Sequence, residues 1–101
     1  MEKMALILSN FASPESARSV VRILMQEQII SCANIHQPHF AIYPWNDKIV
    51  EENETCVLFK GPWAKKDTLV KRLREIHPYE LPGIILIDAE TLPDYAAWLK
   101  G

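Results

Sequence analysis

Apolar residues in this chain alternate between short continuous runs and stretches with helical spacing. Met4–Ser9 and Ile84–Ile87 are continuous apolar runs, which is typical of buried strands. Between them, two stretches with helical spacing flank a long segment rich in β-branched and aromatic residues. The predicted order is strand, helix, strand, strand, helix, strand, followed by a short helix over Pro93–Leu99.

The first helix has a recognisable start. Ser13 suits the N-cap, Pro14 suits the first helical position, and Glu15 places negative charge at the positive end of the helix dipole. Apolar residues then follow at positions i, i+3, i+4 and i+7, namely Ala17, Val20, Val21 and Leu24. We expect this helix to run from about Pro14 to Gln28.

A long hairpin is predicted in the middle of the chain. Pro38 and Pro44 interrupt the strand pattern of Ile29–Trp45, so this strand is expected to be bent or broken. Asn46-Asp47 is a candidate two-residue turn, because Asn and Asp tolerate positive φ better than other residues with a side chain. The strand pattern returns over Lys48–Lys60.

These elements predict one α+β domain over residues 1–101 with a ferredoxin-like arrangement. In that fold a four-stranded antiparallel sheet carries two helices on one face. The second helix is expected to begin after Gly61-Pro62-Trp63 and to end before Pro78. In the closing helix, Tyr95 and Trp98 are three residues apart and should be neighbours.

The charge balance argues against a nucleic-acid partner. Lys and Arg number 11 against 13 Asp and Glu, which gives a net charge of −2, whereas nucleic-acid binding needs a basic surface. No apolar segment is long enough for a membrane span or a leader peptide, so we expect no membrane partner and a cytoplasmic location. The two cysteines, Cys32 and Cys56, are too few for a disulfide-stabilised scaffold.

Three activities common on this architecture lack the residues that they need. The loop Asn10–Pro14 has no Cys-x-x-Cys pair for a metallochaperone, and no glycine or arginine for a phosphate-binding loop. The strand before it has no aromatic residue on which RNA bases would stack. No nucleophile and base have a recognisable spacing. We therefore expect a binding or sensing module and no enzyme.

Metal ligation has few candidates among the histidines and cysteines of the hairpin segment. His36 and His39 have His-x-x-His spacing, but residues three apart in a strand point to opposite faces unless Pro38 bends the chain. Cys32 and His36 would share a face, about 13 Å apart along an extended strand. Cys32 and Cys56 are interpreted as small buried apolar residues.

The densest group of unusual residues is His77-Pro78-Tyr79-Glu80-Leu81-Pro82. One interpretation is a rigid helix terminator, in which His77 complements the helix C-terminus and the prolines stiffen the turn. The other is a binding site, in which an imidazole, a phenol and a carboxylate meet a metal ion or an anion-bearing ligand. Local spacing alone favours the terminator.

Motifs along nearly the whole chain are similar to those of a known family. In order, they are Ser31–Ile35, Tyr43–Ile49, Glu54, Lys60, His77–Pro82, Pro93–Tyr95 and Trp98–Leu99. With these motifs the chain resembles the CutA family of divalent-cation tolerance proteins. The chain departs from the family pattern at Ala41, Asp47, Gly61-Pro62, Gly83 and Ser9–Phe11, and some members carry a cysteine suspected of binding copper in that last segment. Without this thiolate, the expectation of copper binding is weakened, for Cu(I) in particular.

The resemblance implies a homotrimer of ferredoxin-like subunits, related in architecture to the PII signalling proteins. It also implies cytosolic tolerance of copper and other divalent cations by a metal-responsive module that requires no cofactor. Alternatives are a PII-like small-molecule signalling trimer and a purely structural trimeric scaffold. A trimer is also expected because the hairpin exceeds what the sheet can pair, and Ile42, Val57 and Phe59 would need cover from another subunit.

A ligand is expected in a cleft between neighbouring subunits. The resemblance assigns characteristic polar and aromatic residues to nine positions, and the sequence pattern places these positions at strand ends, a turn and a helix end, where side chains can converge: Tyr43, Trp45, Lys48, Glu54, Lys60, His77, Tyr79, Glu80 and Trp98. His77 is the predicted ligand for copper or zinc, and Glu80 supplies an oxygen ligand or pairs with Lys48 or Lys60. In the alternative, Tyr43, Trp45 and Trp98 only pack an interface and Glu80 forms a structural salt bridge.

Overall fold

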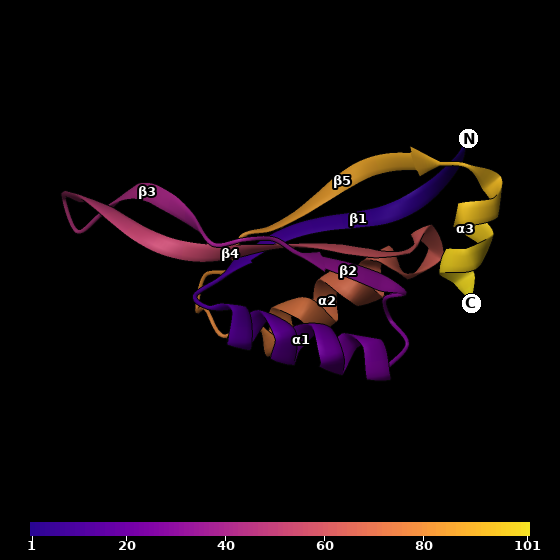
Figure 1. The fold of residues 1–101 in the computed structure, drawn as a ribbon, viewed down its shortest axis with the longest axis horizontal. Coiled ribbons are helices and arrows are strands. Elements are labelled where there is room, and N and C mark those ends of the chain that lie inside the picture. Colours follow the sequence, from indigo (N-terminus) through magenta and orange to yellow (C-terminus); the bar gives the residue numbers. More distant parts are fainter.

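The N-terminal strand lies at the centre of the sheet. In the computed structural model, which describes residues 1–101, β1 pairs antiparallel with β4 on one side and with β5 on the other, and the strand order is β2-β4-β1-β5 (Figure 1). β3 pairs only with the first half of β4. The elements are β1 (Glu2–Phe11), α1 (Pro14–Gln26), β2 (Cys32–Ile35), β3 (His39–Trp45), β4 (Lys48–Pro62), the 3-10 turn η1 (Trp63–Lys65), α2 (Lys66–Ile76), β5 (Ile84–Thr91) and α3 (Pro93–Lys100).

The sheet has five strands, one more than the sequence predicts. The predicted second strand breaks at His36–Pro38, where proline removes a backbone donor, so that β2 and β3 are separate. Both pieces pair with β4, which continues unbroken for 15 residues. The α+β class and the broken strand are confirmed, and the prediction of four strands is wrong.

The β3–β4 hairpin extends beyond the rest of the protein (Figure 1). Its turn is Asn46-Asp47, and the φ angles of 51° and 63° place both residues in the left-handed region that a two-residue type I′ turn requires. The predicted turn is confirmed. Because of this hairpin the molecule is elongated, measuring 46 × 26 × 23 Å.

Local signals determine where the helices begin and end. Ser13 Oγ accepts a hydrogen bond from the Ser16 N–H at 3.1 Å, and Pro14 is the first helical residue, as predicted. α1 ends at Gln26, two residues before the predicted end, and Gln28 has a positive φ of 60°. The second helix begins as η1 and continues as α2. None of the helices is both long and apolar enough to cross a membrane.

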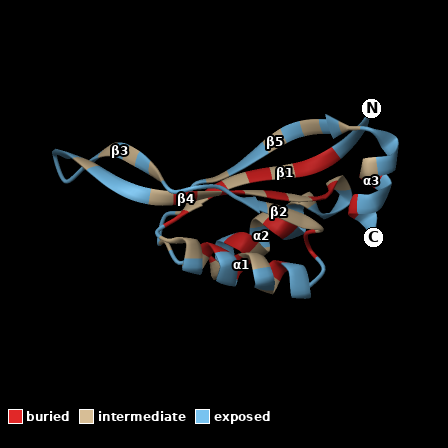
Figure 2. Cartoon of the chain, in the orientation of Figure 1, coloured by how far each residue is buried: buried red, intermediate tan, exposed pale blue.

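The core lies between one face of the sheet and the helices α1 and α2 (Figures 1 and 2). Alternate residues of β1 and β4 are fully buried there against leucines of both helices: Ile7, Phe11, Val57, Phe59, Leu24, Leu69 and Leu73. This corrects one expectation. Val57 and Phe59 need no second subunit, because the protein's own helices cover them. Ile42, in the hairpin, is 63% exposed.

The opposite face of the sheet carries neither α1 nor α2. Leu8 lies there between Leu58 and Ile85 in the strand register, and Ile85 is 54% exposed. α3 packs at the far end of the sheet, where Ser31 Oγ donates a hydrogen bond to the Leu99 carbonyl. Tyr95 and Trp98 stack with ring centroids 5.6 Å apart, as predicted.

Candidate functional site

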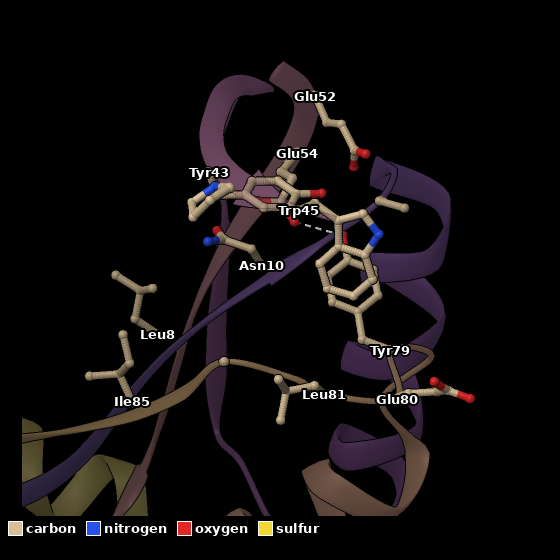
Figure 3. A pocket seen from close by; sticks show the side chains of 13 residues that line it. Leu8, Asn10, Tyr43, Trp45, Glu52, Glu54, Tyr79, Glu80, Leu81 and Ile85 are labelled. Atoms are coloured by element: carbon tan, nitrogen blue, oxygen red, sulfur yellow. Dashed lines mark hydrogen bonds between the residues drawn. The ribbon is translucent and has the colours of Figure 1, made fainter. Parts of the chain in front are cut away.

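A cleft of about 700 Å³ opens where the hairpin leaves the sheet. We call it the hairpin cleft. One wall comes from the β3–β4 hairpin and another from the loop after α2, while β1 and β5 complete it (Figure 3). The lining residues are Leu8, Asn10, Ala12, Tyr43, Pro44, Trp45, Glu52, Glu54, Tyr79, Glu80, Leu81, Gly83 and Ile85.

Five of the nine predicted site residues line the hairpin cleft: Tyr43, Trp45, Glu54, Tyr79 and Glu80. Lys48 lies at the hairpin tip, opposite Trp45 in the register but outside the lining. Lys60 and Trp98 lie toward the end of the sheet that is distant from the hairpin. Along β4, the stretch from Glu54 to Lys60 alone spans about 20 Å. Within one chain the nine residues do not form one group, and their meeting between subunits stays a prediction.

Side-chain alternation places the hairpin residues of the cleft on one face. Tyr43 and Trp45 on β3 share a face with Glu52 and Glu54 on β4, since the register pairs residue 43 with 50 and residue 41 with 52. The predicted site omitted Glu52, although its position two residues before Glu54 is visible in the sequence. Asn10 was also omitted, and its place depends on the pairing of β1 with β4.

One hydrogen bond joins the two walls of the hairpin cleft. Tyr79 Oη donates to Glu54 Oε2 at 2.7 Å (Figure 3, dashed line). Burial and the Glu54 carboxylate raise the pKa of Tyr79 far above its ordinary value of 10.0. Desolvation and the neighbouring Glu52 likewise raise the pKa of Tyr43. Both phenols therefore stay protonated at neutral pH.

His77 is buried behind the loop, and both of its ring nitrogens are engaged. The Tyr79 N–H donates to Nδ1 at 3.1 Å, so the neutral ring carries its proton on Nε2. Nε2 lies 3.1 Å from both the Asn10 carbonyl and Ser9 Oγ, and Ser9 Oγ in turn donates to the Gly83 carbonyl at 2.6 Å. Metal ligation by His77 stays a prediction, and it requires the ring to give up the bond from Tyr79.

The surroundings of His77 favour the neutral imidazole. Its ring stacks on Phe11, with centroids 4.4 Å apart. Burial lowers the pKa of His77 below the ordinary 6.5, although the Asn10 carbonyl and the Glu54 charge act in the opposite direction. A neutral ring does not complement the helix dipole, so the terminator interpretation is supported through packing and hydrogen bonding instead of charge.

The hairpin cleft carries uncompensated negative charge. Glu52, Glu54 and Glu80 line it, and no Lys, Arg or His is among the lining residues. The three ion pairs of the chain, Lys3–Asp88, Lys66–Asp67 and Arg72–Glu27, involve none of these carboxylates. The predicted pairing of Glu80 with Lys48 or Lys60 is not formed within the chain. This arrangement can attract a positive charge.

The chain does not bring three metal-ligating side chains together into a complete site. Cys32 and Cys56 are both free and partly buried, and burial raises the pKa of the Cys56 thiol. His36 is exposed in the segment between β2 and β3. A divalent cation would therefore need a ligand from another copy of the chain, or water in the remaining positions.

Comparison with known proteins gives consistent matches over nearly the full length. The family described as CutA1 divalent ion tolerance protein matches residues 5–101. The chain is 38% identical over 97 residues to the divalent-cation tolerance protein CutA of Pyrococcus horikoshii, covering 95% of this chain and 94% of that protein.

Solved structures share the fold. The crystal structure of the divalent ion tolerance protein CutA1 from Ehrlichia chaffeensis is similar with a TM-score of 0.93 and 27% identity, covering 98% of this chain and 94% of the other. A protein described as PII-like protein CutA from Nostoc sp. PCC 7120 is similar with a TM-score of 0.84 and 32% identity, covering 97% and 93%.

Proposed function

Because the chain belongs to the CutA1 family of divalent ion tolerance proteins, we propose that it acts as a non-enzymatic, metal-responsive module that binds its ligand in the hairpin cleft. The observation that carries this proposal is the cleft itself, which gathers five predicted site residues and three carboxylates without an ion-pair partner. A cation entering the cleft would neutralise charge that the protein leaves exposed.

The proposed assembly is a homotrimer of ferredoxin-like subunits in the cytoplasm. The strand order β5-β1-β4-β2, with two helices on one face, fits such a subunit. The uncovered sheet face and the exposed apolar residues of the hairpin support contact between copies. Two cysteines without a disulfide fit a reducing compartment.

Copper and zinc are the proposed ions, with Glu80 and, after a rearrangement, His77 as ligands. Calorimetric titration of the intact protein with Cu²⁺ and Zn²⁺ tests this. Replacement of His77 by Ala should weaken binding at least about tenfold if its imidazole is a ligand. An unchanged affinity would leave His77 as a structural residue at the end of α2. The matched control is His36→Ala, which removes an exposed imidazole that does not line the hairpin cleft.

A second candidate function is small-molecule signalling in the manner of PII proteins. The Nostoc relative is described as PII-like, and the hairpin cleft is large enough for a small organic ligand. Titration with nucleotides under the same conditions separates the two functions. Heat of binding on metal addition supports the metal-responsive function, and heat of binding on nucleotide addition supports signalling. No heat of binding in either titration supports a structural scaffold.

A further inference from the structure

We propose that His77 takes a metal ion through Nδ1, and that Tyr79 caps this atom in the metal-free protein. The inference rests on the proposed function, because it names the atom of His77 that would ligate and the residues that control access to it. Every contact that carries it is formed within one chain.

The surroundings of Nε2 fix the proton of the neutral ring on that atom. Nε2 lies 3.1 Å from the Asn10 carbonyl, which can only accept a hydrogen bond. It also lies 3.1 Å from Ser9 Oγ. The Ser9 hydroxyl donates its own proton to the Gly83 carbonyl at 2.6 Å, so its oxygen is left to accept. Both neighbours of Nε2 therefore require an N–H, and the lone pair of the ring lies on Nδ1.

These contacts match the outer contacts of a metal-binding histidine. Such a ring ligates with one nitrogen and donates the N–H of the other to a carbonyl or a carboxylate, which fixes the ring and makes the ligating nitrogen more basic. Ser9 is fully buried, and Asn10 lies on the central strand β1, so the core of the sheet holds both acceptors. Burial also lowers the pKa of His77 below 6.5 and keeps the ring in the neutral form that a metal needs.

The backbone of Tyr79 covers Nδ1. Its N–H donates to Nδ1 at 3.1 Å, and the His77 and Tyr79 rings lie with centroids 5.0 Å apart. His77 itself is only 7% exposed. Because Nδ1 has a single lone pair, a metal ion can bind there only after the Tyr79 N–H has left it.

A second bond of the same residue holds the cap in place. Tyr79 Oη donates to Glu54 Oε2 at 2.7 Å (Figure 3), and a hydrogen bond to a carboxylate is stronger than one between neutral groups. Tyr79 thus occupies His77 and Glu54 together, and no three metal-ligating side chains lie together in this closed arrangement. Withdrawal of Tyr79 would free an imidazole nitrogen and a carboxylate at once. The closed arrangement therefore lowers the apparent metal affinity.

Nitrogen NMR of the full chain, with isotope-labelled histidine, tests the assignment of the atoms. The resonances of His77, assigned with His77→Gln, should show a proton on Nε2 and none on Nδ1 at neutral pH. Addition of Zn²⁺ should shift the Nδ1 resonance and leave the proton on Nε2. A proton on Nδ1 in the metal-free protein, or ligation of Zn²⁺ by Nε2, would overturn the inference.

Removal of the bond that holds the cap should strengthen metal binding. Tyr79→Phe keeps the ring and the backbone N–H but loses the bond to Glu54, so calorimetric titration should show a Zn²⁺ affinity about fivefold higher or more. Tyr95→Phe is the matched control, since no hydrogen bond involves the Tyr95 hydroxyl, and its affinity should equal that of the original protein. An unchanged or lower affinity of Tyr79→Phe would refute the cap.

Removal of an acceptor at Nε2 should have the opposite effect. Ser9→Ala takes away one partner of the Nε2–H and should weaken Zn²⁺ binding about tenfold, with a weaker shift of the Nδ1 resonance. The control is Ser19→Ala, at an exposed position of α1, which should change neither. Equal affinities of Ser9→Ala and the original protein would remove Ser9 as a positioning residue. If Ser9→Ala does not fold, the Tyr79→Phe titration and the His77 spectrum decide alone.

The same measurements separate this inference from the proposed function. Heat of binding on Zn²⁺ addition with an unchanged His77 spectrum would overturn the Nδ1 site and leave the metal-responsive function with other ligands. Absence of any heat of binding and of any spectral change would overturn both. Heat of binding together with a shift of the Nδ1 resonance supports both.

Discussion

Tyr79 Oη lies 2.7 Å from Glu54 Oε2, so the loop that follows α2 is tied to the strand at the foot of the hairpin. The two residues are 25 positions apart in the sequence and come from opposite walls of the hairpin cleft. Glu54 is half-buried and the phenol stays protonated, so this bond joins the two walls at neutral pH.

Replacement of Tyr79 by Phe should lower the free energy of unfolding by about 1–2 kcal/mol, since the variant removes one hydrogen bond to a charged acceptor and keeps the ring. Urea denaturation measures this change. Tyr95→Phe is the control, because no hydrogen bond involves the Tyr95 hydroxyl, and it should change stability by less than about 0.5 kcal/mol. Equal effects of the two variants would contradict the role assigned to the Tyr79–Glu54 bond.

Stability should fall in acid because of His77. Its pKa in the folded protein lies below the ordinary 6.5, so below this pH the unfolded chain takes up a proton before the folded protein does. Stability from the neutral ring is thus fully present above pH 6.5 and decreases as pH falls through the folded pKa. Urea denaturation between pH 7.5 and 5 measures the slope of the free energy of unfolding against pH. The His77→Gln variant should have a shallower slope, whereas the exposed His36→Gln should match the original protein; a slope unchanged in His77→Gln would refute the assignment.

Loss of the cap on α1 should cost about 1 kcal/mol. Ser13→Ala removes the oxygen that accepts from the Ser16 N–H, whereas Ser13→Asp restores an acceptor and adds favourable charge at the helix N-terminus. Thermal denaturation should therefore give a lower melting temperature for Ser13→Ala than for the original protein. The melting temperature of Ser13→Asp should be close to that of the original protein. Equal stability of all three proteins would show that the cap contributes nothing measurable.

Phe59→Ala should cost about 3–5 kcal/mol, because the ring is fully buried between the sheet and the helices and would leave a cavity. Ile42→Ala removes an apolar side chain of the exposed hairpin and serves as the comparison. Under dilute conditions that favour separate chains, its effect should stay below about 0.5 kcal/mol. A small effect of Phe59→Ala would contradict the placement of β4 in the core.

If the protein is a trimer, light scattering should give a molecular mass three times the 11.6 kDa of one chain. Ile42→Asp should reduce this mass, because it places a charge on an exposed apolar position of the hairpin that another copy would cover. Asn53→Asp adds the same charge to the same face of the hairpin at an already polar position, and it should leave the mass unchanged. The mass of a single chain in the original protein at micromolar concentration would refute the trimer.

Features that depend on neighbouring residues could be predicted from the sequence. The Ser13 cap, the break at Pro38 and the turn at Asn46-Asp47 all follow from local backbone preferences, and the structure has each of them. Alternation along β4 likewise places Glu52 and Glu54 on one face of the hairpin.

Features that depend on distant contacts could not be predicted in the same way. Val57 and Phe59 look like edge-strand residues until α1 and α2 are placed over them. Lys60 and Trp98 belong to the family motifs, but within one chain they lie toward the end of the sheet that is distant from the hairpin cleft. The engagement of His77 Nε2 depends on Ser9 and Asn10, nearly seventy residues away in the sequence, whereas Nδ1 accepts a hydrogen bond from the nearby Tyr79 N–H.

The position of β1 in the sheet also governs how the chain can fold. Glu2 pairs with Thr91, and Ser9 with Ile84, so β1 finds one of its two neighbours only after all the strands and helices between them have been synthesised. During translation β1 therefore waits with one side unpaired, and closing so large a loop makes folding slow. A nascent chain that lacks β5 would expose the central strand of its own sheet.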